Sequence, residues 1–444
     1  MTQQKLDSEL ERLKQAVAVA VEQATTLGAD QAEVAISRQQ GLSVGTRMKE
    51  VETVEFNQDG ALGISLYLNG CKGTSSTSDL SPEAIEQAVK AAFSIAKYTQ
   101  ADEANGLADS ELMATDPKDL DLCHPQDFTP EQLQALAIRA ESAAMDAGIE
   151  HSDGAHASAH TGLKVYGNSH GFLHGKLTSR YGISMVAIAE QDGKMQRDYD
   201  YTSARRFDEL WTPEQVGQGA AEKVLSHLGA RKLETQTLPV LFQKEVATGL
   251  IGHLVHAISG GALYRKSSFL LDKLGEVVFP SWFNIHENPW IKGGLGSAAY
   301  DSEGVATKPA DIITDGVLAQ YLLTSYSARR MGMQTTGHAG GIYNWHIQDT
   351  GVDFQQILKQ MDKGILVTEV MGQGVNTVNG DYSRGAAGFY VENGEIQYPV
   401  EEFTIAANLK DMFANIVAID NERETRSAIG TGAVLVESMK IAGN

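Results

Sequence analysis

The chain has 444 residues, of which 42% are hydrophobic and 21% are charged, and 57 acidic against 36 basic residues give a formal net charge of -21. This composition predicts a folded protein of two or three domains and excludes an intrinsically disordered chain. The acidic balance argues against binding to nucleic acid or to an anionic membrane surface, because both repel a negatively charged protein.

The remaining compositional signals concern the compartment. The longest apolar stretches are interrupted by charged and amide residues, so we expect no membrane-spanning segment. The first residues are acidic and amphipathic, unlike a secretory signal, and we therefore expect a cytoplasmic protein. Only two cysteines occur, Cys71 and Cys123, and their wide separation argues against a disulfide framework.

The first hundred residues predict a helix, antiparallel strands and a second helix. Apolar residues at three- and four-residue steps predict the first helix from Ser8 to Thr26. Ser81 and Pro82 form an N-cap signature for the second helix, which we expect to end near Ala96. Alternating runs between the helices predict four short strands, with Asp59-Gly60 and Asn69-Gly70 as turns: residues 33–37, 41–46, 50–57 and 62–68.

The same order recurs downstream, after a segment at 101–128 that we interpret as a linker. Thr129-Pro130 and Thr212-Pro213 begin helices that we expect to end near Ala147 and Leu228. Leu163 follows Leu42 by 121 residues and Gly182 follows Gly63 by 119, whereas Pro213 follows Pro82 by 131. These offsets predict a duplicated unit with an insertion of about ten residues late in the second copy. A chance similarity of two ordinary α+β units is the alternative. The predicted strands of the second copy are 162–166, 171–179 and 181–190.

A boundary near residues 233–237 introduces a glycine-rich second half. Strands at Leu238–Phe242 and Gly364–Val370 and helices at Glu245–Ser259 and Phe354–Met361 are its clearest elements. We therefore predict an α+β fold with two parts. Residues 1–235 form an N-terminal α+β region of two related units, about 1–100 and 129–232, and residues 236–444 form a β-rich domain of barrel or sandwich type.

Histidine pairs are the only candidates for a metal site. His253 and His256 lie three residues apart in a predicted helix, but Leu254 follows the first histidine where a zinc peptidase motif of the type His-Glu-x-x-His has glutamate. A second group of histidines follows no known ligand spacing: His151, His156, His160, His170 and His174. Hydrogen-bonded structural histidines are the alternative interpretation of both groups, so we assign no metal ligand.

No nucleophile motif or phosphate-binding loop is present either, so we assign no catalytic residue. Two glycine-rich stretches, 324–341 and 380–388, concentrate polar and aromatic side chains that could line a cleft. The candidate lining residues are Tyr326, Arg329, His338 and Arg384. Satisfied turns and buried arginines explain the same pattern equally well.

Seven runs in the second half resemble the TldD/PmbA family, and specifically its PmbA (TldE) type of subunit. They include Tyr264-Arg-Lys-Ser-Ser-Phe-Leu, Thr336-Gly-His-Ala-Gly-Gly and Gly380-Asp-Tyr-Ser-Arg-Gly-Ala-Ala-Gly. The other four runs are 301–304, 323–329, 370–374 and 391–396. The resemblance extends over nearly the whole chain and is dense from residue 238 onward.

The resemblance implies a zinc-dependent peptidase made of a TldD-type and a PmbA-type subunit, associated with microcin maturation, antitoxin degradation and, in earlier names, modulation of DNA gyrase. In the TldD type, a His-Glu-x-x-x-His motif and a later cysteine hold the zinc. The matching histidine positions here are Gly252 and Ala257, the glutamate position is His253, and no cysteine follows Cys123. The resemblance therefore implies a subunit without a cofactor, with zinc in the TldD-type partner.

Three hypotheses follow from the sequence. The first is a non-catalytic subunit of a cytoplasmic heterodimeric peptidase that acts on small or unfolded peptides, with a homodimer as an option for the chain alone. The second is an autonomous metallopeptidase with an unusual histidine site. The third is a regulatory binding protein without proteolytic activity, for which the net charge favours a basic protein over DNA as the target.

Overall fold

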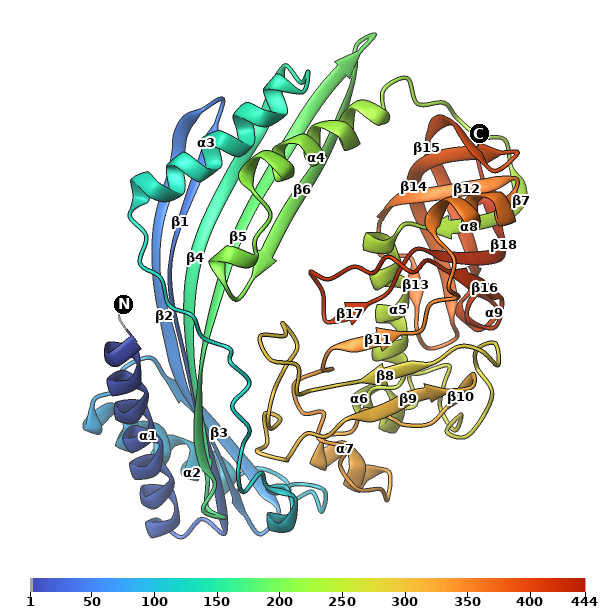
Figure 1. Cartoon of the computed structure of the whole chain (residues 1–444). Coiled ribbons are helices and arrows are strands. Elements are labelled where there is room, and N and C mark those ends of the chain that lie inside the picture. The colour runs from blue at the N-terminus through green and yellow to red at the C-terminus, as the bar shows by residue number, and fades with distance from the viewer. Residues whose placement is uncertain (1–2, 444) are drawn as a thin grey trace.

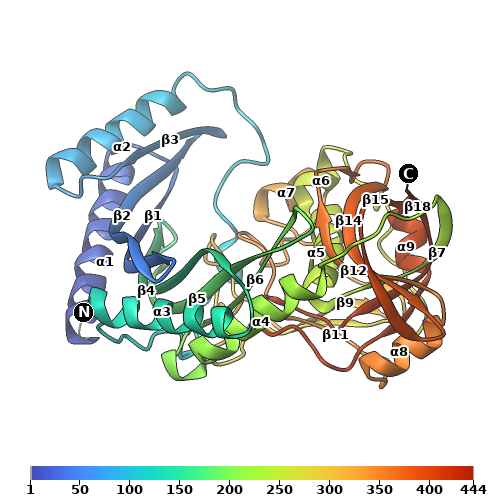
Figure 2. The same ribbon diagram turned by 90° about the horizontal axis from the view of Figure 1, so that it is seen from above.

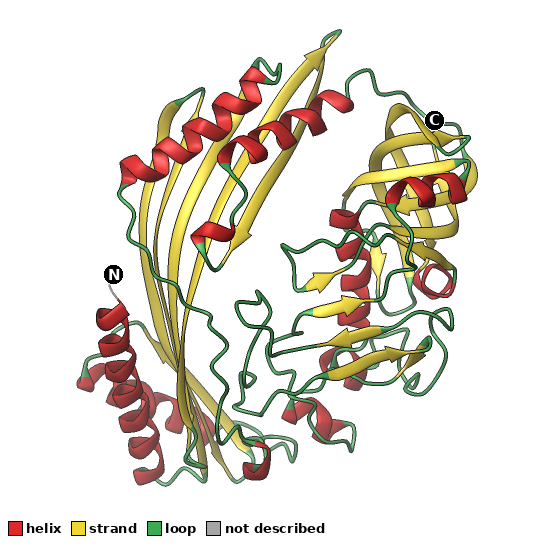
Figure 3. Ribbon diagram, viewed as in Figure 1, coloured by secondary structure: helices red, strands yellow, loops and turns green. Residues whose placement is uncertain are grey.

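The computed structural model describes residues 3–443 and has an α+β fold in two parts (Figures 1 and 3). The N-terminal part contains one long, curved antiparallel sheet with two pairs of helices. The C-terminal part contains a ring of strands and a smaller sheet. Among residues 3–443, no helix is long and apolar enough to cross a membrane.

The N-terminal part repeats the order helix, three strands, helix. Its first unit consists of α1 (Gln3–Thr26), β1 (Gln31–Arg47), β2 (Glu50–Leu68), β3 (Cys71–Thr77) and α2 (Pro82–Ala96). Its second unit consists of α3 (Pro130–Asp146), β4 (His151–Asn168), β5 (Leu173–Gln191), β6 (Lys194–Ala204) and α4 (Pro213–Ser226). The strand order is β3-β2-β1-β4-β5-β6, so the antiparallel pair β1–β4 joins the two units at the centre of the sheet.

Both helix pairs cover the same face of this sheet. Ala32, Val34 and Ile36 of β1 pack in one core with α1 and α2, whereas Val44 packs in a second core with α3 and α4. These four residues are separated by even numbers of positions, and side chains alternate along a strand, so all four point to one face. Figures 1 and 2 show the pairs at opposite ends of the strands. The α-helices of the described N-terminal part, α1 to α4, leave the other face uncovered, and we call it the helix-free face.

The predicted helices of this part are confirmed, with small shifts at their ends. Ser81 caps α2, and Thr129 and Thr212 form capping boxes at the starts of α3 and α4. The predicted strands are shorter than the strands in the structure. Asp59 and Gly60 pair with Gln39 and Arg38 inside continuous strands, so no turn forms there. Long pairing on both sides of β1 outweighs the local turn preference of the Asp-Gly pair.

The C-terminal part is built around a closed ring of strands. Its ring consists of β7 (Gln236–Phe242), β12 (Gly364–Met371), β14 (Asp381–Glu392), β15 (Glu395–Asn408) and β18 (Val434–Ala442). Each of these strands pairs with two of the others, which closes the ring. Short strands β13 (Val375–Asn376) and β16 (Ile416–Ile419) pair with β14 and β18.

Two hydrophobic cores lie on the two sides of the ring. Val240 and Phe242 of β7 join the large core that includes α5 (Lys244–Ala257), whereas Leu241 joins a smaller core with α8 (Phe354–Met361). The predicted helices at 245–259 and 354–361 correspond to these two elements. Three short helices complete the part: α6 (Gly260–Tyr264), α7 (Ser325–Arg330) and α9 (Leu409–Ala414).

A second sheet of short strands lies beside the ring. Its order is β10 (Val317–Leu318), β9 (Ala310–Thr314), β8 (Ile285–Glu287), β11 (Trp345–Ile347) and β17 (Ile429–Gly430). Trp345 is 2% exposed and belongs to the large core, so this sheet and the ring share one hydrophobic interior.

The two parts contact each other through the linker, the helix-free face, and the edge strand β6 with the end of α4, where His227 contacts Thr368 at 2.9 Å. The linker is largely irregular, with a short 3-10 helix at Ser110–Leu112. Met113 of the linker packs with Tyr166 and Phe172 of the sheet and with Tyr300 and Val305 of the C-terminal part. A further contact is polar and centres on Arg426, which pairs with Asp200 of β6.

Candidate functional site

The helix α5 carries the positions that the resemblance connects with zinc. A Cβ atom added at Gly252 would meet no atom within 4 Å, whereas Ala257 is fully buried. Neither residue has a side-chain atom that can donate electrons to a metal. His253, at the glutamate position, packs edge-on against Tyr382 with ring centroids 5.9 Å apart.

The surroundings of His253 favour its uncharged form. Burial lowers the pKa of its imidazole, and the nearby charges of Arg384 and His256 lower it further. His256 itself is exposed. Across residues 3–443, no three His, Cys, Asp or Glu side chains come together in an arrangement that could hold a metal ion. The residues present therefore do not fit a zinc site.

The N-terminal histidines are spread along the second unit. His156 and His160 of β4 lie on the helix-free face, where their rings cover Gly45 and Gly41 of β1. A Cβ atom at Gly41 would lie 1.8 Å from Nδ1 of His160, so the ring packs directly on the glycine. This close approach requires glycine at that position.

His174 sits elsewhere, against the rings of Phe172 and Tyr300. His151 begins β4 and is exposed, and His170 lies in the turn between β4 and β5. The five histidines are therefore not gathered at one point.

Two predicted cleft residues hold the linker instead. Tyr326 of α7 donates a hydrogen bond to Oδ2 of Asp102 at 2.8 Å. Arg329 donates to the carbonyls of Ala104, Gly106 and Leu107. Both side chains thus fasten the linker to the C-terminal part.

The other two cleft candidates lie apart from these. His338 is 6% exposed, and its Nε2 donates to Oε1 of Glu287 at 2.7 Å, so it lines no surface in this structure. Glu287 is fully buried and also accepts hydrogen bonds from the backbone of Tyr343 and from the indole of Trp345. Arg384 of β14 donates to the carbonyls of Val370 and Met371. The structure does not bring the four candidates together.

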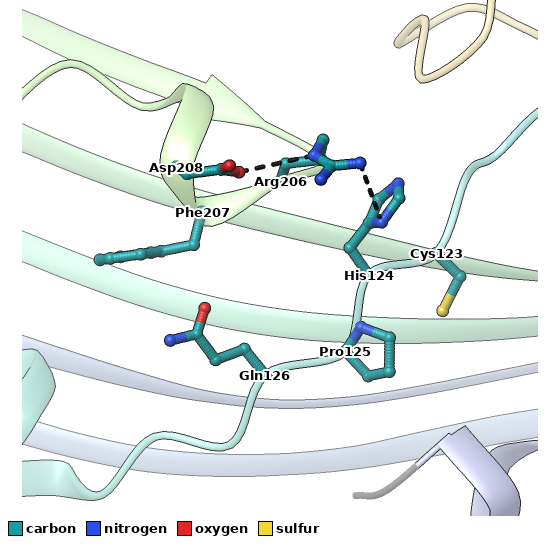
Figure 4. Close-up of a pocket in the computed structure, with 7 residues that line it drawn as sticks. All are labelled: Cys123, His124, Pro125, Gln126, Arg206, Phe207 and Asp208. Carbon is teal, nitrogen blue, oxygen red and sulfur yellow. Dashed lines mark hydrogen bonds and ion pairs between the residues drawn. The ribbon is translucent and has the colours of Figure 1, made fainter.

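An open hollow lies where the linker passes the end of β6 (Figure 4). Its lining consists of Cys123, His124, Pro125, Gln126, Arg206, Phe207 and Asp208. Arg206 contacts Nδ1 of His124 at 3.5 Å and the carboxylate of Asp208 at 3.5 Å. Burial raises the pKa of the Cys123 thiol to about 11, so this cysteine is protonated at neutral pH and is a poor nucleophile.

The helix-free face carries a group of positive charges that the sequence did not reveal. Lys164 of β4 pairs directly with Lys176 of β5, and four residues further along, His160 pairs with Arg180. Arg205, just after β6, lies close enough to influence the pKa of Lys176. We call Lys164, Lys176, Arg180 and Arg205 the cationic cluster.

The charges of the cationic cluster are not balanced by ion pairs within residues 3–443. None of its four side chains forms an ion pair with an Asp or Glu among residues 3–443, although 57 acidic residues are present in the chain. Burial, together with the charges of Lys164 and Arg205, lowers the pKa of Lys176 to about 8. Periodicity alone could not locate this cluster, because the strand register brings together residues that are distant in the sequence.

Three sequence profiles of one family match the chain in consecutive segments. The PmbA/TldA metallopeptidase domain 1 matches residues 32–96, the central domain matches 123–228, and the C-terminal domain matches 235–443.

Relatives with the PmbA name match the chain from end to end. Metalloprotease PmbA of Escherichia coli O157:H7 is 55% identical over 433 residues, which cover 97% of this chain and 96% of the relative. A metalloprotease PmbA homologue of Haemophilus influenzae is 53% identical over 443 residues, covering 99% and 98%. A metalloprotease TldD homologue of H. influenzae is 24% identical over 273 residues, or 56% of either chain.

Solved structures share the fold over the whole chain. The crystal structure of a proposed modulator of DNA gyrase from Bacteroides thetaiotaomicron has a TM-score of 0.90 and 26% identity, and covers 97% of this chain and 99% of its own. The structure of TldE from Thermococcus kodakarensis has a TM-score of 0.84 at 19% identity, covering 96% and 100%. Profiles, relatives and fold agree, and the chain belongs to the PmbA/TldD metallopeptidase family, on its PmbA side.

Proposed function

We propose that this chain is the non-catalytic subunit of a two-subunit zinc peptidase. In this proposal a TldD-type chain holds the zinc and cleaves small or unfolded peptides, and the present chain completes the assembly in which they are bound. The chain itself holds no cofactor, and we place the assembly in the cytoplasm.

The proposal rests on which residues occupy the zinc-ligand positions of helix α5. The two positions that correspond to zinc-binding histidines are Gly252 and Ala257, and neither residue offers a ligand. His253 stands where the TldD type has a glutamate, and a neutral imidazole packed on Tyr382 is badly placed to activate a water molecule. A zinc peptidase needs about three protein ligands and a nearby base, and this helix provides neither.

The need for a partner follows from the same argument. If a chain of a metallopeptidase family lacks the zinc ligands, a role in proteolysis requires a second chain that has them. H. influenzae has both a PmbA homologue and a TldD homologue among the relatives, which supports two distinct chains in one cell.

The test combines metal analysis with a peptidase assay on three samples: this chain, a TldD-type chain, and their mixture. We expect the chain alone to be free of stoichiometric zinc and inactive, and the mixture to cleave an unfolded peptide faster than the TldD-type chain alone. Size-exclusion chromatography with light scattering should show a heterodimer in the mixture and reports whether the chain alone is a homodimer.

Two outcomes would reject the proposal. One equivalent of zinc with activity in the isolated chain would favour an autonomous enzyme, and the histidines of the second unit would then be tested by substitution. Activity of the TldD-type chain that is the same with and without this chain, in the absence of a complex, would remove the subunit role.

A further inference from the structure

On the helix-free face, like charges lie opposite each other and no ion pair among the described residues balances them. Both features lower the stability of the sheet. Lys164 and Lys176 occupy directly opposite positions on neighbouring antiparallel strands, and like charges placed this way destabilise a sheet. No ion pair with a carboxylate of the described residues relieves the repulsion, and Arg205 adds a further positive charge. A ligand that supplies negative charge would remove this cost.

We propose that the cationic cluster binds acidic peptide segments in an extended conformation. The inference rests on the proposed function in one respect: a peptidase subunit is expected to contact peptides. The choice of an acidic ligand rests on the cluster itself. Charge complementarity identifies the ligand, because the rest of the chain is strongly acidic and would repel the same peptide elsewhere.

The spacing of the cluster suits an extended chain. Lys164 and His160, like Lys176 and Arg180, lie four residues apart on one strand and point to the same face. Four residues of extended strand span about 13 Å. An extended peptide with carboxylates at every second position, aligned with β4 and β5, would present one carboxylate to Lys164 and Lys176 and another to Arg180.

Both arginines of the cationic cluster are already held in position. Nε of Arg180 donates to Oγ of Ser203 at 2.9 Å, and Arg205 donates from Nε and one terminal nitrogen to the carbonyls of Gly294 and Leu295. Each guanidinium keeps further N–H groups that these bonds do not use. Fixed donors lose little conformational entropy on binding, which favours carboxylate recognition.

The test measures binding to the full chain alone, by fluorescence anisotropy, with a labelled peptide that alternates Glu with Thr and is long enough to span both pairs. The control peptide has Gln in place of Glu. We expect the Glu peptide to bind at least about tenfold more tightly at low salt, and the preference to shrink as salt is raised.

The double variant K164Q/K176Q should reduce affinity for the Glu peptide by about tenfold or more. The matched control K90Q/K97Q removes one charge in the middle of α2 and one at its C-cap, on the helix-covered side, and should bind like the wild type. Circular dichroism should show that both variants are folded.

Equal losses in the two double variants, or no preference for Glu over Gln, would overturn the proposal. Tighter binding of a single-stranded DNA oligonucleotide than of the Glu peptide would also overturn it. The measurement needs no partner and no catalysis, so it is independent of the proposed subunit role. If the peptide binds but no TldD-type chain is activated, the proposed function fails and the acidic-peptide site stands.

Discussion

Arg426 of the C-terminal part donates a hydrogen bond to Oδ1 of Asp200 on β6 at 3.0 Å, and so connects the two parts of the chain through a buried ion pair. The same guanidinium contacts Glu424 and Glu245 and lies over the rings of Tyr201 and Trp211. A single cation therefore neutralises carboxylates from both parts.

Replacing Arg426 with Ala should lower the free energy of unfolding by about 3–5 kcal/mol, because buried Glu424 would lose its ion-pair partner and Asp200 would keep only Lys223. Denaturant titration followed by circular dichroism measures the loss. The matched control is Arg139→Ala, which breaks the exposed Arg139–Glu214 pair and should cost less than about 1 kcal/mol. Equal losses in the two variants would contradict a special role for Arg426.

The acid side of the stability profile should depend on Glu424. Burial opposes its ionisation, but hydrogen bonds from Arg426 outweigh burial and lower the pKa of the carboxyl below its usual value. A carboxyl with a lowered pKa in the folded state stabilises the protein above its unfolded-state pKa, and this contribution disappears as the pH falls through the folded-state pKa.

Glu424→Gln should therefore be less stable than wild type at neutral pH, and the difference should narrow at a pH below about 4. Chemical denaturation at a series of pH values compares the two proteins. If the difference in the free energy of unfolding between the two proteins is the same at every pH, the Glu424 carboxyl contributes by its shape and not by its charge.

Two helical glycines should respond in opposite directions to alanine. A Cβ at Gly217 of α4 would lie 2.0 Å from the carbonyl oxygen of Ala140 on α3, so Gly217→Ala should cost roughly 1–3 kcal/mol by forcing the helices apart. Gly252 of α5 has open space around it, and Gly252→Ala should stabilise by roughly 0.5–1 kcal/mol through helix propensity. Thermal melts of both variants show directly whether each substitution raises or lowers the stability. A stabilised Gly217→Ala protein would mean that α3 and α4 do not pack this closely in solution.

The attachment of the linker should depend on Arg329 more than on Tyr326. Arg329→Ala removes hydrogen bonds to three linker carbonyls, whereas Tyr326→Phe removes one bond to Asp102. We expect limited proteolysis to cut Arg329→Ala within residues 101–116 several-fold faster than wild type, with a smaller change for Tyr326→Phe. Mass spectrometry of the fragments locates the cuts. Unchanged rates in both variants would show that packing around Met113, and not these bonds, holds the linker.

Helix ends were predictable because capping is a local matter. Ser81, Thr129 and Thr212 each precede a proline and accept a hydrogen bond from the backbone of the first turn, and these signals lie within four residues of sequence. Strand lengths were not predictable from local signals. Asp59-Gly60 is a strong turn sequence, yet it lies inside β2 because pairing with β1 extends over both sides of it.

The site was harder to predict than the fold for the same reason. The missing zinc ligands at Gly252 and Ala257 could be inferred from resemblance, because they depend on residue identity. The cationic cluster depends on register, which places Lys164 opposite Lys176 only after β4 and β5 have paired. His338 was expected at a cleft, but it lies in a loop and bonds to Glu287 of β8, 51 residues earlier in the chain, inside the core.

The central pair β1–β4 also has a consequence for folding during synthesis. Its partners are far apart in the chain: Gln39, for example, pairs with Gly162. At a synthesis rate of about 5–20 residues per second, β1 is made roughly 6 to 25 seconds before its partner on that side is available. Throughout that interval a long strand edge is exposed on the ribosome, and such edges promote pairing with other chains. The exposed β1 edges of newly made first units must therefore be kept from pairing with one another until the second unit of each chain has been made.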